Sequence, residues 1–187
     1  MNRNIDIIFF GDSLTYGYGV PKEKSWVYLT AKELCFNYIN KGKNGDTTPS
    51  MLSRYYKDVL KYNPSSVFLM GGTNDLLCGR NIQSIVDNIR IMIEDAHKIN
   101  IRVTLGIPPK IIGSIANKLF IPSPFYSYAE EKLSILRKSL INLSKIYNTD
   151  LIDFYSMNFS NTLYIDGLHL SSKGNYIMYK EAVKILV

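Results

Sequence analysis

The sequence predicts an α/β protein built on a parallel sheet, and three observations support this fold class. Short apolar runs of strand length recur along the chain, beginning with IDIIFF at residues 5–10. Longer stretches with apolar residues at helical spacing lie between these runs. Polar loops, most of them rich in glycine, follow the runs. Strands that alternate with helices favour a sheet with helices on both faces.

Five strands are expected. The run at 5–10 is continuously apolar, as is typical of a strand buried on both faces. The other four strands are predicted at 36–40, 66–70, 101–107 and 150–154. Because helices separate them, we expect these strands to run parallel with right-handed crossovers.

Capping residues mark the first two predicted helices. Ser25 is expected to cap a helix that ends near Cys35, with the thiol on its buried face. Thr48 followed by Pro49 is expected to be an N-cap with proline at the first helical position, which opens a helix to about Tyr62.

Three further helices follow. Asn81 is expected to cap a helix whose apolar residues recur at helical spacing. Another helix is predicted over 126–147, and Ser171 or Ser172 is expected to begin the last one. Residues 108–128 show no helical or strand pattern and are expected to form a long loop.

Composition indicates a single globular domain over residues 1–187. Hydrophobic residues make up 46% and charged residues 20%, which is ordinary for a globular protein. The net charge is +6, but the lysines are spread along the chain and no basic run resembles a nucleic-acid-binding arm. We therefore expect no nucleic-acid partner.

Cysteine usage and hydropathy predict a cytoplasmic protein without metal or cofactor. Cys35 and Cys78 form no CxxC or zinc-ligand pattern, which suits a reducing compartment. The apolar run near the N-terminus is too short for a signal peptide. No stretch approaches the 18 apolar residues of a transmembrane helix, so stable membrane insertion is not expected.

The loops that follow the strands are where a site is expected, because ligands of such sheets sit beyond the carboxyl ends of the strands. Polar residues gather at 11–14, 40–48, 71–75 and 164–170. Each loop alone is an ordinary turn, but the coincidence of all four at strand ends indicates a functional site.

The two histidines differ in context. His97 lies near the end of a predicted helix, where a surface position is favourable to the helix dipole. His169 follows Asp166 by three residues in a loop. A serine nucleophile needs a histidine base, and the base needs an acceptor that fixes its tautomer. His169 is therefore the candidate base, with Asp166 as its partner and Ser13 as the nucleophile.

The four loops resemble the sequence blocks of the SGNH hydrolases, also called GDSL esterases and lipases, in the order of that family and over nearly the whole chain. These blocks are Gly11-Asp12-Ser13-Leu14, Asn44-Gly45-Asp46-Thr47, Gly71-Gly72-Thr73-Asn74-Asp75 and Asp166-Gly167-Leu168-His169. The resemblance implies a three-layer α/β/α sandwich on a flavodoxin-like five-stranded sheet of order 2-1-3-4-5. In that order the second and third strands flank the first, and residues 155–165 must return from the far edge.

The resemblance also implies a catalytic machinery. Ser13, Asp166 and His169 are the expected catalytic residues. The backbone N–H groups of Ser13 and Gly45 and the side-chain amide of Asn74 are the expected oxyanion donors. The function expected is cleavage of carboxylic esters of the acyl, lysophospholipid or aryl type, through an acyl-enzyme on Ser13.

Two acids near the site are expected to be structural. Asp12 is beside the nucleophile but is expected to organise its loop, because an extended turn points it away from the base position. Asp75 is expected to hold the turn after the third strand.

Several alternatives stay open or are disfavoured. Carbohydrate O-acetyl ester hydrolysis on the same site remains open, and a non-catalytic binding module is retained as a further alternative. An aspartyl phosphatase is disfavoured because position 14 is Leu where that chemistry needs a second acid. The GxGxxG, phosphate-loop and GxSxG motifs do not occur.

The substrate-binding residues are expected in two aromatic and apolar segments. One follows the nucleophile, and the other is the long segment 108–128, since structureless segments of this length are often lids or binding loops. Packing over the sheet edge is the open alternative for the second. The candidates are Tyr16, Tyr18, Ile112, Phe120 and Phe125.

Overall fold

The computed structural model describes residues 4–186 and contains a five-stranded parallel sheet of order β2-β1-β3-β4-β5. Each neighbouring pair of strands is parallel. The predicted fold class and strand order are therefore confirmed. The strands are β1 (Ile7–Gly11), β2 (Tyr38–Gly42), β3 (Ser66–Met70), β4 (Arg102–Ile107) and β5 (Asp150–Asp153).

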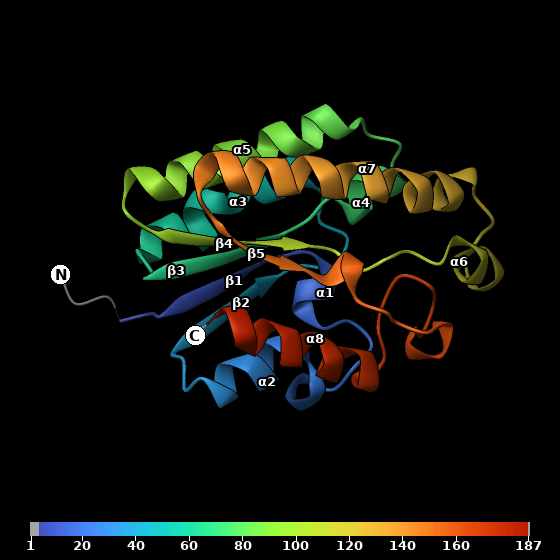
Figure 1. Cartoon of the computed structure of the whole chain (residues 1–187), viewed down its shortest axis with the longest axis horizontal. Helices are drawn as coiled ribbons and strands as arrows, with labels where there is room; N and C mark the ends of the chain where they lie inside the picture. Colours follow the sequence, from blue (N-terminus) through green and yellow to red (C-terminus); the bar gives the residue numbers. More distant parts are fainter. Residues whose placement is uncertain (1–3, 187) are drawn as a thin grey trace.

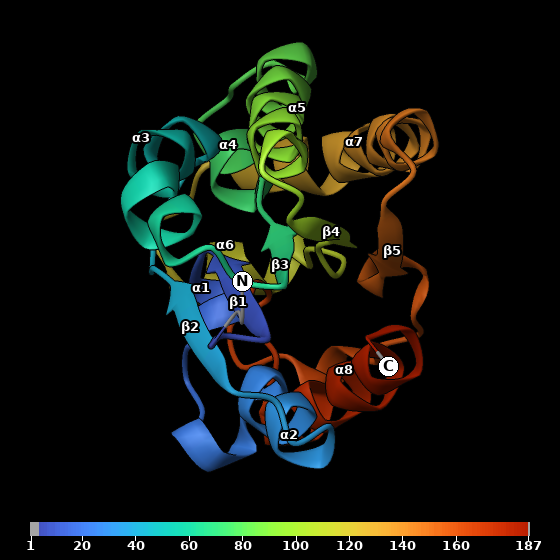
Figure 2. The same cartoon turned by 90° about the vertical axis from the view of Figure 1, so that its left-hand side faces the viewer.

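Helices cover both faces of the sheet and complete the expected three layers (Figures 1 and 2). One face carries α3 (Thr48–Asp58), α4 (Thr73–Leu77), α5 (Ile82–Lys98) and α7 (Pro124–Tyr147), and the other carries α2 (Trp26–Glu33) and α8 (Ser172–Ile185). Short helices α1 (Ser13–Tyr16) and α6 (Gly113–Leu119) lie toward the carboxyl end of the strands (Figure 1). Single 3₁₀ turns form η1 (Lys22–Lys24), η2 (Leu60–Tyr62), η3 (Phe154–Ser156) and η4 (Asn161–Leu163). No helix within residues 4–186 is long and apolar enough to cross a membrane.

An aromatic cluster packs under β1 on the face covered by α2 and α8. The fully buried Trp26 ring lies edge-on to Phe9 at 5.5 Å, to Phe68 at 5.0 Å and to Phe154 at 5.4 Å between ring centroids. Such aromatic contacts add to the free energy gained by burying the rings. The indole Nε1–H also donates to the carbonyl oxygen of Leu14 at 2.9 Å. The core therefore anchors α1 directly.

Most of the predicted helix starts are confirmed. The side chain of Ser25 accepts from the backbone N–H of Tyr28, that of Asn81 from Ser84, and that of Ser171 caps α8. The expectation for Thr48 was wrong by one residue. Thr47 is the N-cap of α3, which places Pro49 within the first two helical positions. The Thr48 hydroxyl donates elsewhere, to Asp75.

Other expectations were wrong for local reasons. Cys35 is exposed, because the chain leaves α2 through a left-handed turn with φ +53° at this residue. The second strand begins at Tyr38, and α3 ends at Asp58 before the separate 3₁₀ turn η2. The segment 108–128 is not a structureless loop, because it contains α6 and the start of α7.

Gly42 lets the end of β2 approach helix α1, which begins at Ser13. A Cβ at this position would lie 2.2 Å from the backbone nitrogen of Tyr16 and 2.6 Å from its Cα. The Asn40 side chain stabilises the same approach, since it accepts from the N–H of Gly42 at 2.8 Å and donates to the carbonyl of Thr15 at 3.0 Å.

We expect Gly42→Ala to lower the free energy of unfolding by about 1–3 kcal/mol, because the added methyl group would push on backbone rather than on a flexible side chain. Urea unfolding measures the change. Lys43→Ala is the control at the next position, where the side chain is 66% exposed, and a change within about 0.5 kcal/mol is expected. Equal stability of Gly42→Ala and the wild type would contradict the close approach.

Candidate active site

Ser13 lies where β1 stops and α1 starts. The carboxylate Oδ1 of Asp12 accepts from the backbone N–H of Leu14 at 2.9 Å and caps α1. Gly11 permits the sharp exit, because a Cβ there would lie 2.3 Å from the hydroxyl of Thr15 and 2.5 Å from the carbonyl oxygen of Met70. The nucleophile candidate is therefore presented at the sheet edge by a glycine and a capping carboxylate. The expected loop-organising role of Asp12 agrees with this geometry.

A chain of hydrogen bonds joins Ser13 to residues near the other end of the chain. The hydroxyl of Ser13 is 2.8 Å from Nε2 of His169, and Nδ1 of His169 is 2.7 Å from Oδ2 of Asp166. The other carboxylate oxygen of Asp166 accepts the backbone N–H groups of Leu168 at 2.9 Å and His169 at 2.7 Å. Asp166 thus fixes both the ring and the backbone of His169.

The environment keeps Asp166 ionised. Burial by itself raises the pKa of this carboxyl, but the hydrogen bonds from the side chain and the backbone N–H of His169, together with the N–H of Leu168, outweigh burial. The net result is a pKa below the usual value. A carboxylate in this state accepts a hydrogen bond from Nδ1–H of His169, which leaves Nε2 free to accept a hydrogen bond from the Ser13 hydroxyl.

The segment after β5 returns across the carboxyl edge, as the strand order required. Tyr164 pairs with Leu170 across the turn in an isolated antiparallel bridge, and its hydroxyl donates to the carbonyl of Lys110 at 2.7 Å. The N–H of Ile112 donates to the carbonyl of Gly167 at 2.8 Å. The connection before α6 therefore holds the loop that carries Asp166 and His169.

The candidate oxyanion donors come from the loops after β1, β2 and β3. Gly45 has φ +76°, and a Cβ placed at this residue would have no atom within 4 Å. One N–H of the Asn74 amide donates to the carbonyl of Asp46 at 2.9 Å. Within residues 4–186 the backbone N–H groups of Ser13 and Gly45 make no hydrogen bond. Ser13, Gly45 and Asn74 all line one cavity.

That cavity has a volume of about 250 Å³ and largely apolar walls. Tyr18 packs against the imidazole of His169, with 4.5 Å between ring centroids. Phe120 also lines this cavity. The remaining lining residues are Leu14, Asn44, Thr73, Leu77 and Leu168. These five were not among the substrate-binding residues expected from the sequence. Four of them belong to the sequence blocks, and the fifth, Leu77, follows the third block by two residues.

Three of the five expected substrate-binding residues lie elsewhere. Tyr16 lines a separate hollow beside β2. Ile112 packs into the core cluster under β1. Phe125 lines a neighbouring cavity of about 240 Å³, which shares Phe120 with the first. Of the candidates, the structure brings only Tyr18 and Phe120 to the cavity at Ser13.

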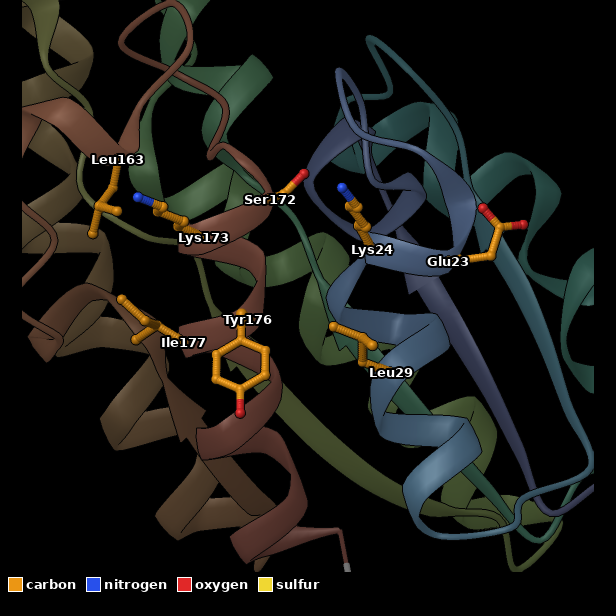
Figure 3. A pocket seen from close by; sticks show the side chains of 8 residues that line it. All are labelled: Glu23, Lys24, Leu29, Leu163, Ser172, Lys173, Tyr176 and Ile177. Carbon is orange, nitrogen blue, oxygen red and sulfur yellow. The ribbon is translucent and has the colours of Figure 1, made fainter.

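A larger cavity of about 550 Å³ lies between α2 and α8 (Figure 3). Leu29 and Tyr176 extend toward it from the two helices (Figure 3). Its lining residues are Glu23, Lys24, Leu29, Leu163, Ser172, Lys173, Tyr176 and Ile177. These include no histidine and no residue of the four loops, whereas Ser13 and His169 both line the smaller cavity.

The second structural acid, Asp75, makes contacts beyond the turn that it was expected to hold. It is fully buried and accepts the backbone N–H of Thr48 at 2.8 Å and its hydroxyl at 2.7 Å. It therefore joins α4 to the start of α3 rather than only holding its own turn. His97 is exposed in the last turn of α5, as expected. Residues 4–186 hold no group of three or more His, Cys, Asp or Glu that could bind a metal ion.

The sheet and the four loops at its edge are those of the SGNH hydrolases. The chain belongs to the GDSL-like lipase/acylhydrolase family, whose model matches residues 9–177. This match confirms the resemblance on which the site assignment was based.

Individual relatives agree with the family. An uncharacterized lipoprotein, YqeF, of Bacillus subtilis (strain 168) is 32% identical over 147 residues, 71% of this chain and 60% of that protein. An arylesterase of Vibrio mimicus is 32% identical over 111 residues, 55% of this chain and 56% of that protein. The chain thus spans less than two thirds of either relative. A lipase/acylhydrolase structure from Enterococcus faecalis matches 96% of this chain and 94% of its own, with 26% identity and a TM-score of 0.80.

The buried carboxyl of Asp12 predicts a pH-dependent stability. Burial raises its pKa to about 7, although the N–H of Leu14 opposes the shift, and its Oδ2 has no partner within residues 4–186. The unfolded chain releases this proton near pH 4. Between pH 4 and 7 the folded state therefore binds more protons than the unfolded state, so the carboxyl lowers stability as the pH rises.

We expect Asp12→Asn, which keeps the Oδ1 acceptor, to match the wild type in stability near pH 4 and to exceed it at pH 8 by on the order of 4 kcal/mol. Urea unfolding of both proteins across this pH range measures the difference. A difference that stays constant with pH would contradict the raised pKa.

Proposed function

We propose that the protein hydrolyses carboxylic esters by acyl transfer through Ser13. The observation that carries the proposal is the 2.8 Å contact between the Ser13 hydroxyl and Nε2 of a histidine whose other nitrogen is bound to Asp166. A serine hydroxyl becomes an effective nucleophile when an oriented imidazole accepts its proton. Membership of the GDSL-like lipase/acylhydrolase family supports the same chemistry.

In the first half of the reaction Oγ of Ser13 attacks the ester carbonyl carbon while its proton passes to Nε2 of His169. The tetrahedral intermediate collapses, the bond to the leaving alcohol breaks, and His169 returns the proton to that alcohol. In the second half His169 takes a proton from water, which attacks the acyl-enzyme. Ser13 is then released with its proton restored and the acid leaves.

Two groups of residues lower the barrier in this scheme. The Asp166 carboxylate holds the tautomer of His169 and stabilises the imidazolium that forms. The N–H groups of Ser13 and Gly45 and the side-chain amide of Asn74 hold the oxyanion. An amide nitrogen carries two donors, and only one of those of Asn74 is used by Asp46. Fixed donors of this kind are often the largest single contribution to catalysis.

The cavity favours an ester with an apolar acyl or aryl group. Leu14, Leu77 and Leu168 contribute aliphatic walls, and Tyr18 and Phe120 contribute rings. A volume of about 250 Å³ suits a short or medium acyl chain. The Vibrio mimicus relative is an arylesterase, which supports this class. An O-acetyl ester of a carbohydrate is the second candidate, because an acetyl group also fits this volume and Asn44 offers a polar contact for a sugar.

We propose a reducing compartment, the cytoplasm, as the location. Both cysteines, Cys35 and Cys78, are free and exposed, which suits such a compartment. Fractionation of cells that express the protein tests this, because the Bacillus subtilis relative is a lipoprotein by name. Recovery in the membrane fraction would overturn the proposed location.

The first test removes the nucleophile. We expect Ser13→Ala to lower kcat for p-nitrophenyl butyrate by about 10⁴-fold or more while the protein stays folded, because the acyl-enzyme can no longer form. A fluorophosphonate probe should label the wild type and not this variant. Ser160→Ala, at an exposed serine, is the control and should keep full activity. Turnover retained in Ser13→Ala would exclude the mechanism.

The second test concerns chain length. Leu77, Phe120 and Leu168 line both the cavity at Ser13 and its neighbour, so removing the Phe120 ring should join the two spaces. We expect Phe120→Ala to raise kcat/KM for an octanoyl ester relative to an acetyl ester by about 10-fold or more, since each buried CH₂ contributes about 0.8 kcal/mol.

Leu119→Ala is the matched control, because Leu119 is 60% exposed and lines neither cavity. A panel of p-nitrophenyl esters beside acetylated sugars gives the measurement. If Phe120→Ala leaves the octanoyl-to-acetyl ratio of kcat/KM unchanged, the acyl chain does not pass this ring. Activity on acetylated sugars alone would favour the carbohydrate ester candidate.

A further inference from the structure

Arg54 binds one residue of its own helix, α3, and two segments beside the catalytic loops. Its Nε donates to Oδ2 of Asp46 at 2.6 Å, its Nη1 to Oδ2 of Asp58 at 2.9 Å and its Nη2 to the carbonyl oxygen of Gly11 at 3.0 Å. The guanidinium carbon lies 4.2 Å from the centroid of the Phe10 ring, and the side chain is only 14% exposed. Every nitrogen of this guanidinium is therefore held.

The two contacts of Arg54 outside its own helix are backbone neighbours of the proposed oxyanion donors. The Gly11 carbonyl lies two residues before Ser13, at the point where β1 ends. Asp46 directly follows Gly45, and its own carbonyl accepts the Asn74 amide at 2.9 Å. A single guanidinium thus connects the chain segments that supply all three donors.

The chemistry of the pair makes this connection rigid. Asp46 is 4% exposed, so an unpaired carboxylate there would be costly. A guanidinium is planar and holds its donors in a fixed fork, which defines the direction of each bond. Satisfied buried polar networks of this kind restrict the groups they join to one arrangement.

Charge around Arg54 is balanced by its neighbours. Burial by itself raises the pKa of Asp58, but hydrogen bonds from Arg54 and Lys41 outweigh it and lower that pKa. Asp58 therefore stays ionised beside Arg54, and Asp46 supplies a second carboxylate. Arg54 does not line the cavity at Ser13, so it does not touch substrate there.

We propose that Arg54 is a positioning residue for the oxyanion hole, holding Gly11 and Asp46 so that the N–H groups of Ser13 and Gly45 and the Asn74 amide converge. This proposal rests on the proposed esterase function. Arg54 acts through the donors, so its loss should weaken binding of the transition state more than binding of the ester.

Two substitutions at Arg54 test the proposal. Arg54→Lys keeps one charge but cannot donate in a fixed fork to Asp46 and Gly11 together. Arg54→Met removes the charge and keeps much of the length. The chain offers a matched control in Arg137, which donates from Nε at 2.8 Å to Asp153 at the end of β5 and lies over the ring of Tyr155. Arg137 contacts none of the four catalytic loops in these bonds.

The readouts are kcat and KM for p-nitrophenyl butyrate and the inhibition constant of an alkyl trifluoromethyl ketone. The ketone carbon bonds to Oγ of Ser13, the serine proton passes to His169, and the carbonyl oxygen becomes an oxyanion in the hole. The inhibition constant therefore reports on the oxyanion donors. Thermal unfolding shows that each variant is folded.

We expect Arg54→Met to lower kcat by about 10²-fold, as for loss or displacement of an oxyanion donor, with KM within about 3-fold of the wild type. The inhibition constant should rise by a similar factor. Arg54→Lys should lose about 10-fold in kcat, and it carries the test if Arg54→Met does not fold. Arg137→Lys and Arg137→Met should keep kcat and the inhibition constant.

The outcomes separate the two proposals. A folded Arg54→Lys with unchanged kcat and inhibition constant, in a wild type that works through Ser13, overturns only the role of Arg54. Equal changes in kcat and in the inhibition constant in the Arg137 variants also overturn this role. They would show that loss of any such arginine lowers activity through stability. A wild type that hydrolyses no ester overturns the esterase function, and a Ser13→Ala variant that still hydrolyses esters overturns the mechanism through Ser13. Either result removes the role of Arg54 as well.

Discussion

The parallel pairing of β1 between β2 and β3 is the constraint from which the site geometry follows. Parallel strands bring their carboxyl ends to the same edge of a sheet, so the loops after these three strands meet there. Ser13, Gly45 and Asn74 come from those three loops and line one cavity. The histidine arrives separately, by a return segment from the far edge that bonds to the connection before α6.

The carboxyl of Asp12, which caps the helix that begins at Ser13, lowers the stability of the fold. Asp12 caps α1 with one oxygen, while the other is buried without a partner within residues 4–186. A neutral cap would avoid this cost at neutral pH. The position is next to Ser13, the proposed nucleophile, and functional sites commonly retain groups that a purely stable fold would exclude.

Sequence patterns were informative where one local feature decides the outcome. The apolar run of β1 and the caps Ser25 and Asn81 were predicted correctly, because strand burial and side-chain capping depend on neighbouring residues. The same patterns failed for α6 and for the exposure of Cys35. A seven-residue helix has too few turns for a clear periodicity, and Cys35 leaves α2 through a left-handed turn that no pattern marked.

By itself the sequence determined the fold class, the strand order through its family blocks, and the identity of Ser13, Asp166 and His169 as residues that belong together. Only the tertiary structure decided that Tyr18 and Phe120 border the cavity while Tyr16 and Ile112 do not, and that Arg54 joins β1 to the loop of Asp46. Motif residues are recognisable because chemistry restricts their type and spacing. Lining and positioning residues depend on which helix faces lie beside the site, and packing between segments distant in sequence sets those contacts.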